Sequence, residues 1–111
     1  MSPDKDIFCK IIAGEIPSQL VAEDTDWIAI NDIHPKAPVH VLIIPRKHIA
    51  SIADLETEDQ SLAGKLMLAV RQVGEKLGIA KNGYRVMISH GEHGGQEVPH
   101  LHIHVLGGKR L

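Results

Sequence analysis

The sequence predicts an α+β domain with a mainly antiparallel sheet of five strands, covered by helices. Three observations support this prediction. Five short apolar or β-prone segments end at turn residues, one longer segment has helical periodicity, and that segment separates the third strand from the fourth. At 111 residues the chain fits one domain. We take it to span residues 1–111, with residues 1–5 and 109–111 as flexible ends.

The first elements are a short helix and a hairpin. The helix is expected over residues 7–13, where Asp6 can cap the first turn and Gly14 can end the last. Beyond a proline, two β-prone runs at 19–23 and 27–31 flank a polar turn. These runs predict two antiparallel strands that pair with each other.

The remaining elements are a buried strand, an amphipathic helix and two more strands. The buried strand is a nearly continuous apolar run that Pro45 closes. Thr57 and Gln60 match a capping box at the start of the helix, which Gly78 ends. The expected ranges are 39–44 for the strand, 57–77 for the helix, and 84–89 and 100–106 for the last two strands.

Composition excludes several classes of function. With 43% hydrophobic residues, 23% charged residues and a net charge of -2, the chain is typical of soluble globular proteins and lacks the positive field that long nucleic acids require. The single cysteine, Cys9, excludes an intrachain disulfide. No apolar stretch is long enough to cross a membrane, and the start does not resemble a secretory signal. We therefore expect a cytoplasmic protein with no membrane partner.

The eight histidines are the compositional outlier, and three of them alternate near the end of the chain. In a strand, His100, His102 and His104 would share one face while the apolar residues between them anchor the other. Three adjacent imidazoles repel one another when charged, so at least one should stay neutral. A neutral imidazole on a rigid strand is suited to nucleophilic attack on phosphorus.

A glycine-rich segment, residues 90–99, lies directly before this histidine strand. Gly94 and Gly95 would let the backbone approach a ligand closely and expose amides to phosphate oxygens, and Gln96 adds a side-chain donor. Such a segment is a weak signal alone, because glycines also build ordinary turns. Its position before the histidines strengthens the prediction of a phosphate site.

The residues also match a known pattern. The run His100-Leu101-His102-Ile103-His104-Val105-Leu106 has the form His-x-His-x-His-x-x with x apolar, which names the histidine triad (HIT) family. The segments 7–12, 32–40 and 94–96 resemble the histidine triad nucleotide-binding (Hint) branch. The resemblance covers about residues 7–108, nearly the whole chain.

This resemblance implies a HIT-like domain that dimerises into a continuous sheet. It also implies a homodimer that binds purine nucleotides such as AMP and GMP derivatives. The implied activity is hydrolysis of the P–N bond of purine nucleoside phosphoramidates, adenosine phosphoramidates in particular, through a covalent nucleotidyl-histidine. No cofactor or metal ion is required for that reaction.

Carried over by position, the resemblance assigns roles to individual residues. His102 matches the nucleophile and is supported by His40, His100 and His104, with His104 near the phosphate and the leaving group. The nucleotide-binding positions are Asp32 for the ribose, Ile7, Phe8, Ile11 and Ile33 for the purine, and Ser89, Gly95, Gln96 and Glu97 for the phosphate.

Several positions depart from the family pattern. Ser89, Glu97 and Pro99 stand where many relatives have other residues, and the sequence ends at Leu111, where many relatives continue in a tail. These departures concern contacts to the phosphate and the leaving group. The preference for a leaving group is therefore the property that the resemblance transfers least.

Two other interpretations stay open. A zinc site could use His40, His100, His102 and His104, although alternating residues on one strand form a row rather than a cage. The chain could also be a nucleotide-binding regulatory protein whose hydrolysis is incidental. Independently of these functions, Asp32 could merely start the turn before Pro35, and Ile7, Phe8, Ile11 and Ile33 would be apolar for core packing in any case. We interpret Cys9 as a small helix residue without a redox role, and His34, His48, His90 and His93 as surface or loop residues.

Overall fold

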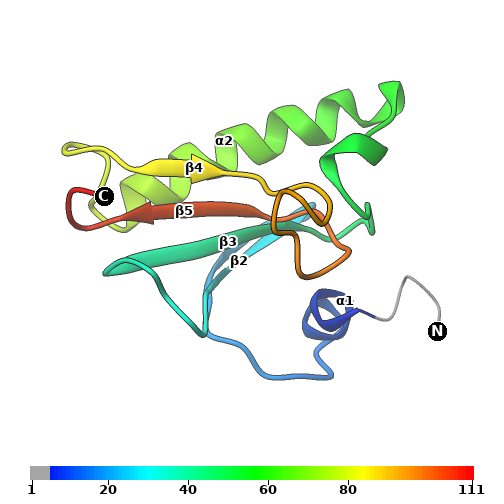
Figure 1. Ribbon diagram of the computed structural model, residues 1–111, viewed down its shortest axis with the longest axis horizontal. Coiled ribbons are helices and arrows are strands. Elements are labelled where there is room, and N and C mark those ends of the chain that lie inside the picture. Colours follow the sequence, from blue (N-terminus) through cyan, green and yellow to red (C-terminus); the bar gives the residue numbers. More distant parts are fainter. Residues whose placement is uncertain (1–5) are drawn as a thin grey trace.

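The computed structural model describes residues 6–111, which form a five-stranded sheet with one helix on each face (Figure 1). The predicted flexible segment 1–5 lies outside the described residues, whereas 109–111 are exposed. The helices are α1 (Ile7–Ile12) and α2 (Gln60–Lys76), and the strands are β1 (Leu20–Glu23), β2 (Trp27–Asn31), β3 (Val39–Pro45), β4 (Arg85–Met87) and β5 (Ile103–Gly107).

The strands follow the order β1-β2-β3-β5-β4, and every neighbouring pair is antiparallel. β3 is the central strand, since Val41 aligns with Asn31 of β2 and with Val105 of β5. This register places His40 and Leu42 of β3 beside the histidine strand. The predicted hairpin and the predicted α+β architecture are confirmed.

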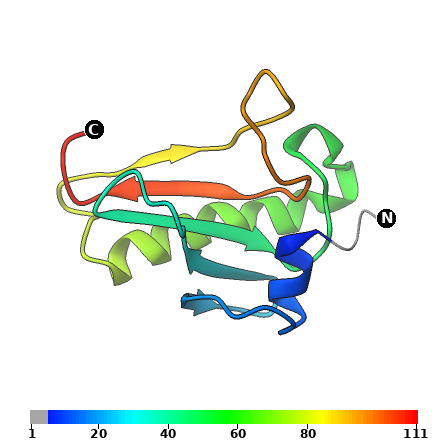
Figure 2. The same cartoon turned by 60° about the horizontal axis from the view of Figure 1, so that its bottom comes forward.

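The two faces of the sheet carry separate apolar clusters. On the α2 face, Val41, Ile43 and Val105 are fully buried among residues of the long helix. On the α1 face, Phe8 packs with alternate residues of the central strands, including Ile30 and Leu42. Figure 2 shows α1 and α2 on opposite sides of the sheet. This second, smaller core holds α1 over the same face that carries the histidines.

The helix caps agree with the predictions only in part. Asp6 accepts a hydrogen bond from the Cys9 amide at 2.8 Å, as a capping residue should. The predicted capping box at Thr57 and Gln60 is wrong. Glu56 and Asp59 form it instead, around a short 3-10 turn, because the buried Asp59 carboxylate accepts the Glu56 amide and also pairs with Lys47.

The last two strands are shorter than predicted, and β5 begins at Ile103 rather than at His100. The backbone just before β5 makes its hydrogen bonds outside the strand ladder: the His100 amide donates to Val98 and the Leu101 amide to Ile49. The alternation survives nonetheless, because Leu101, Ile103 and Val105 all join the core on the α2 face. Among the described residues, no helix is long and apolar enough to cross a membrane.

Candidate active site

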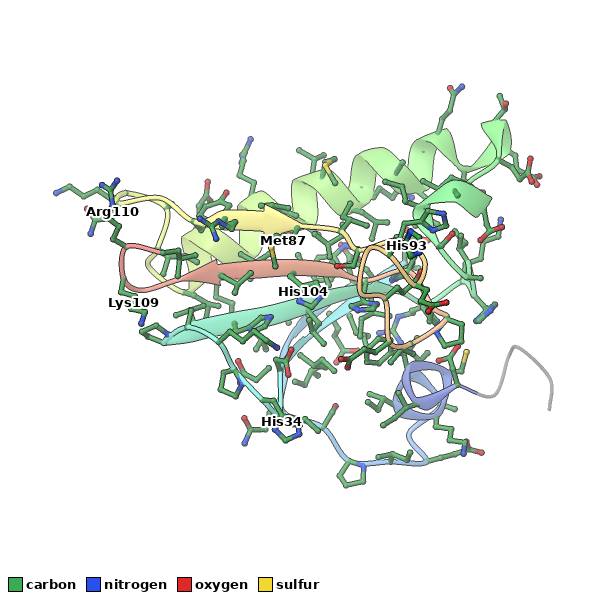
Figure 3. The ribbon with its side chains drawn as sticks, viewed as in Figure 1. His34, Met87, His93, His104, Lys109 and Arg110 are labelled. Atoms are coloured by element: carbon green, nitrogen blue, oxygen red, sulfur yellow. The ribbon has the colours of Figure 1, made fainter. Side chains whose placement is uncertain are left out.

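A cavity of about 610 Å³ opens on the α1 face of the sheet. Its walls come from α1 and the segment after it, from the ends of β2 and β3, and from the loop that precedes β5. Figure 3 shows His104 on this side of β5, and His34 on the connection between β2 and β3. The cavity therefore lies between the small core and the predicted catalytic strand.

His102 lies at the buried side of this cavity, with 8% of its surface exposed. Its Nδ1 lies 2.7 Å from the backbone oxygen of His100. Because a carbonyl can only accept, Nδ1 carries the proton and Nε2 keeps the lone pair. The Phe8 ring meets the imidazole edge-on, with ring centroids 4.9 Å apart. The structure thus fixes both the tautomer and the orientation of this ring.

A second fixed arrangement joins His40 and His104. The Lys36 amide donates to His40 Nδ1 at 3.1 Å, so the proton of His40 is on Nε2. That Nε2 lies 2.9 Å from His104 Nδ1, which must accept, and the proton of His104 is therefore on its own Nε2. The ring centroids of His102 and His104 are 5.0 Å apart. A nitrogen lone pair and an N–H donor thus lie side by side in the cavity wall.

Burial keeps these imidazoles uncharged. Burial lowers the pKa of His102 below the ordinary value of 6.5, and it also lowers the pKa of His40. For His104, burial together with repulsion from His102 and His40 lowers the pKa to about 4. The expectation that clustered histidines stay neutral agrees with these directions, so His102 can act as a nucleophile at neutral pH.

Asp32 lies beside the mouth of the cavity. Its Oδ1 accepts the His34 amide at 2.8 Å, which is the turn-forming bond that the sequence suggested. Its Oδ2 lies 3.4 Å from His40 Nε2. The carboxylate thus builds the turn and also presents an acceptor to the cavity, so the two interpretations of Asp32 are compatible.

The glycine-rich loop requires glycine for a steric reason. A Cβ on Gly94 would lie 2.2 Å from the His90 carbonyl oxygen, and Gly95 has a φ of 80°. The Gln96 side chain is used within the protein: its amide group donates to the backbone oxygens of Ala50 and Val98, at 2.7 and 2.9 Å. This side chain braces the loop, and a phosphate contact would have to come from elsewhere in it.

The cavity gathers nearly all of the predicted site residues. Every one of them lines it except His100 and Gln96. His100 supports His102 through its backbone carbonyl, while its imidazole turns toward Asp6, Cys9 and His48. The lining residues that the sequence did not single out are Ile16, Pro17, Ser18, Gln19, Ile30, Asn31, His34, Lys36, Leu42, Met87 and Val98. Strand alternation around His40 would have pointed to Leu42, whereas residues 16–19 come from a segment that holds no sequence signal for a site.

The family model of the HIT domain matches residues 13–111 of this chain. The chain belongs to the HIT domain family. This HIT protein is 47% identical to Protein HitA of Neisseria gonorrhoeae, over 94% of this chain and 96% of that one. It is 43% identical to a purine nucleoside phosphoramidase of Escherichia coli K12, over 97% of this chain and 91% of that one.

Solved structures confirm the HIT fold of the protein. A histidine triad protein from Clostridium difficile superposes with a TM-score of 0.94 at 40% identity, covering 100% of this chain and 96% of that one. A HIT family hydrolase from Legionella pneumophila gives a TM-score of 0.92 at 43% identity, covering 94% and 93%. The architecture inferred from the histidine pattern is therefore correct for the whole described chain.

Proposed function

We propose that this HIT protein hydrolyses the P–N bond of purine nucleoside 5'-phosphoramidates, adenosine derivatives in particular, through a covalent nucleotidyl-His102. The observation that carries the proposal is the hydrogen bond from His102 Nδ1 to the His100 carbonyl. It leaves the Nε2 lone pair of a neutral imidazole in a cavity large enough for a nucleotide. The phosphoramidase named among the relatives supports the choice of bond.

In the first step, His102 Nε2 attacks the phosphorus, an N–P bond forms, and the bond from phosphorus to the substrate amine breaks. The amine leaves poorly unless it is protonated, so it takes a proton that originates in solvent. His104 is the side chain placed to pass that proton, because its Nε2–H faces no protein acceptor in the described contacts.

In the second step, water attacks the same phosphorus, its surplus proton passes to solvent, and the bond to His102 breaks. The nucleoside monophosphate leaves, and the imidazole regains its lone pair. The cationic imidazolium of the intermediate is a good leaving group, so one difficult displacement becomes two easier ones. Neither step is assigned to a metal ion.

The cavity lining suggests how the nucleotide lies. Ile7, Phe8 and Ile11 of α1, together with Ile33, form an apolar wall for the purine. Asp32 offers carboxylate oxygens to the ribose hydroxyls. Ser89, Gly95 and Glu97, which also line the cavity, are proposed to contact the phosphate, with the Glu97 amide as the donor.

The test is to trap the intermediate. The wild-type protein is mixed with an adenosine phosphoramidate labelled at phosphorus and quenched in base, and the labelled peptide is sequenced. We expect label on His102, none in His102→Ala, and normal labelling in His93→Ala, whose residue lies in an exposed loop. Turnover without label, or unchanged turnover in His102→Ala, would contradict the proposal. Nucleotide binding without any turnover would instead favour a regulatory nucleotide-binding protein.

We also propose that the protein is a homodimer whose sheets join into one. The support is the outer strand β4, which pairs with β5 alone among the described residues and carries Val86 and Met87 at 41% and 38% exposure. Edge strands of this kind pair readily with another chain. Light scattering on the protein should give twice the chain mass, and Val86→Lys should lower it. A monomer at all concentrations would refute this assembly.

A further inference from the structure

The catalytic cavity carries little positive charge for a site that is proposed to take an anionic ligand. Burial is the largest cause of the lowered pKa values of His40, His102 and His104, so these rings are mostly neutral at pH 7. Two carboxylates, those of Asp32 and Glu97, also line the cavity, and the whole chain has a net charge of -2. An anionic nucleotide would therefore be repelled unless cations lie near the entrance.

Lys36 is the only lysine or arginine that lines the cavity in the described part of the chain. The residue is exposed, and its amide donates to His40 Nδ1 at 3.1 Å, which holds its backbone beside the catalytic rings. Repulsion from Lys36 also adds to burial in lowering the pKa values of His40 and His104. The charge of Lys36 therefore acts on the part of the cavity where the phosphate is proposed to bind.

The last residues of the chain bring two more cations to the same end of the sheet. β5 ends beside the start of β3. Gly108 then lies against Pro38, since a Cβ on Gly108 would be 2.9 Å from the Pro38 Cβ. Lys109 and Arg110 follow and are exposed, and Figure 3 shows both at this end of the sheet. Lys36, Lys109 and Arg110 thus form a basic rim that two distant segments of the sequence build together.

The cations of the basic rim form no ion pair with any described carboxylate. The ion pairs of lysine and arginine within the described chain use Arg46, Lys47, Lys65 and Arg71 instead. A carboxylate partner offsets most of the field of a paired cation. The field of an unpaired cation extends into solvent for about a Debye length, which is about 10 Å at 0.1 M salt. The basic rim is therefore a region of positive potential on a chain of negative net charge.

We propose that the basic rim captures anionic nucleotides from solvent and guides them to the catalytic histidines. The inference rests on the proposed nucleotide hydrolysis and concerns the step that precedes it. Attraction to the rim raises the concentration of the ligand at the cavity entrance, so association becomes faster. Lys109 and Arg110 do not line the cavity, so they act on the approach of the ligand and not on the bound state. The rim thereby favours nucleotides over uncharged nucleosides, which fit the same apolar wall.

The test measures association rates by stopped flow at low and at high salt. The ligands are a fluorescent AMP analogue and the matching uncharged nucleoside, and neither contains a P–N bond that the protein could cleave. We expect the association of the AMP analogue to slow several-fold from low to high salt, while that of the nucleoside hardly changes. The nucleoside thus controls for effects of salt on the fold and on the apolar wall.

Two double variants with the same change in net charge separate the basic rim from the rest of the surface. Lys109→Gln with Arg110→Gln should slow association of the AMP analogue about three- to tenfold at low salt, with dissociation near wild type. Lys65→Gln with Arg71→Gln, on α2 at the other face of the sheet, is the matched control and should slow it less than about twofold. Lys36→Gln should slow association and also speed dissociation, and Lys36→Arg should restore both rates. Circular dichroism confirms that each variant is folded.

Equal slowing by the two double variants would overturn the proposal, because net charge and not the basic rim would then set the rate. Association that responds neither to salt nor to the loss of Lys109 and Arg110 would also overturn it. Both results leave the proposed hydrolysis standing, since that is scored by the label on His102. Fast, rim-dependent association without labelling would refute the hydrolysis and keep the capture step. An AMP analogue that does not bind at all would refute both.

Discussion

Two histidine clusters lie on the same side of the sheet, one at His40 and His104 and the other around Asp6. They differ in how their hydrogen-bonding groups are paired. From Lys36 through His40 to His104, each donor faces an acceptor, and one N–H remains for the cavity. Around Asp6, by contrast, two imidazoles face one buried carboxylate: its Oδ2 lies 3.1 Å from His48 Nδ1 and 3.2 Å from His100 Nδ1. The first cluster is a chain of neutral groups, whereas the second is built around a charge.

This comparison shows that residue type alone does not decide what a histidine does. His100 and His102 are two positions apart, yet the His100 ring faces the Asp6 carboxylate and the His102 ring is proposed to attack phosphorus. Burial without a carboxylate partner keeps His102 neutral, and the backbone fixes its tautomer. The Asp32–His40–His104 group also brings three potential metal ligands together. The hydrogen bond of 2.9 Å from His40 Nε2 to His104 Nδ1 already pairs these two nitrogens, so this group favours proton handling over metal binding.

The sharpest way to break the comparison is to remove the two neighbouring histidines separately. His102→Ala should reduce phosphoramidate turnover by on the order of 10⁴-fold or more, because the nucleophile is lost. His100→Ala removes the ring but keeps the backbone carbonyl that orients His102, so its turnover with saturating substrate should fall far less. Steady-state kinetics on both variants check this, and equal loss of turnover in both would refute the division of roles.

The pH dependence gives the next largest effect. Because burial lowers the pKa of His102 below 6.5, turnover should persist as the pH falls through 6.5 and decline only below it, about tenfold per pH unit. A profile that already fell by half at pH 6.5, in protein still folded, would contradict a buried neutral nucleophile.

Stability should follow the same residues. His104 has a pKa of about 4 when folded against 6.5 ordinarily, so the unfolded chain binds more protons between these values. The free energy of unfolding should therefore decrease as the pH falls from about 6.5 to about 4, and urea titrations can follow it. For Asp6, burial favours a higher pKa, but the Cys9 amide and His100 outweigh it and lower the pKa. The stability that ionised Asp6 contributes is lost only below pH 3.8, so its pH range is separate from that of His104. His104→Gln should make this decrease between pH 6.5 and 4 shallower without abolishing it, because the lowered pKa values of His40 and His102 act in the same direction.

Sequence reasoning placed His102 and His104 together in the cavity wall because its signals are local. Alternation along one strand put His102 and His104 on the face opposite to Ile103, and the structure agrees. The hairpin was equally predictable, because both strands and their turn are adjacent in the chain. A resemblance in the ordered motifs then linked His40 and Asp32 to the strand.

The other cluster was missed because its members are distant in the sequence. Cys9 is 39 positions from His48 and 91 from His100, and no periodicity connects them. The predicted β5 also began too early, since regular alternation was extended back to His100. In the structure the chain before Ile103 bonds to Val98 and Ile49 instead. Only the packing of α1 against β3 reveals where the His100 ring turns.

A smaller effect should follow from changing Asp32, the carboxylate beside the hydrogen-bonded pair His40 and His104. Asp32→Asn keeps an oxygen for the His34 amide, so the turn should survive, but it removes the charge proposed to accept from the ribose. We expect AMP binding to weaken about tenfold or more, as for the loss of a charged hydrogen bond. Calorimetry with AMP and with its dideoxyribose analogue checks this, because the variant should no longer distinguish them. Unchanged discrimination would remove Asp32 from the ribose site.

The smallest effect is expected at Gln96, which links the surroundings of the two clusters. Its side chain donates to Ala50, two residues after His48, and to Val98, two residues before His100. Gln96→Ala leaves these carbonyls and the Gly91 amide without that partner, which should cost about 1 to 2 kcal/mol of stability. The loop should then hold the phosphate less firmly, raising KM a few-fold while kcat stays near wild type. Urea titration and kinetics measure both, with Glu92→Ala in the same exposed loop as the control. If KM is unchanged although stability falls, the loop acts on the fold alone and the phosphate must be held by other groups.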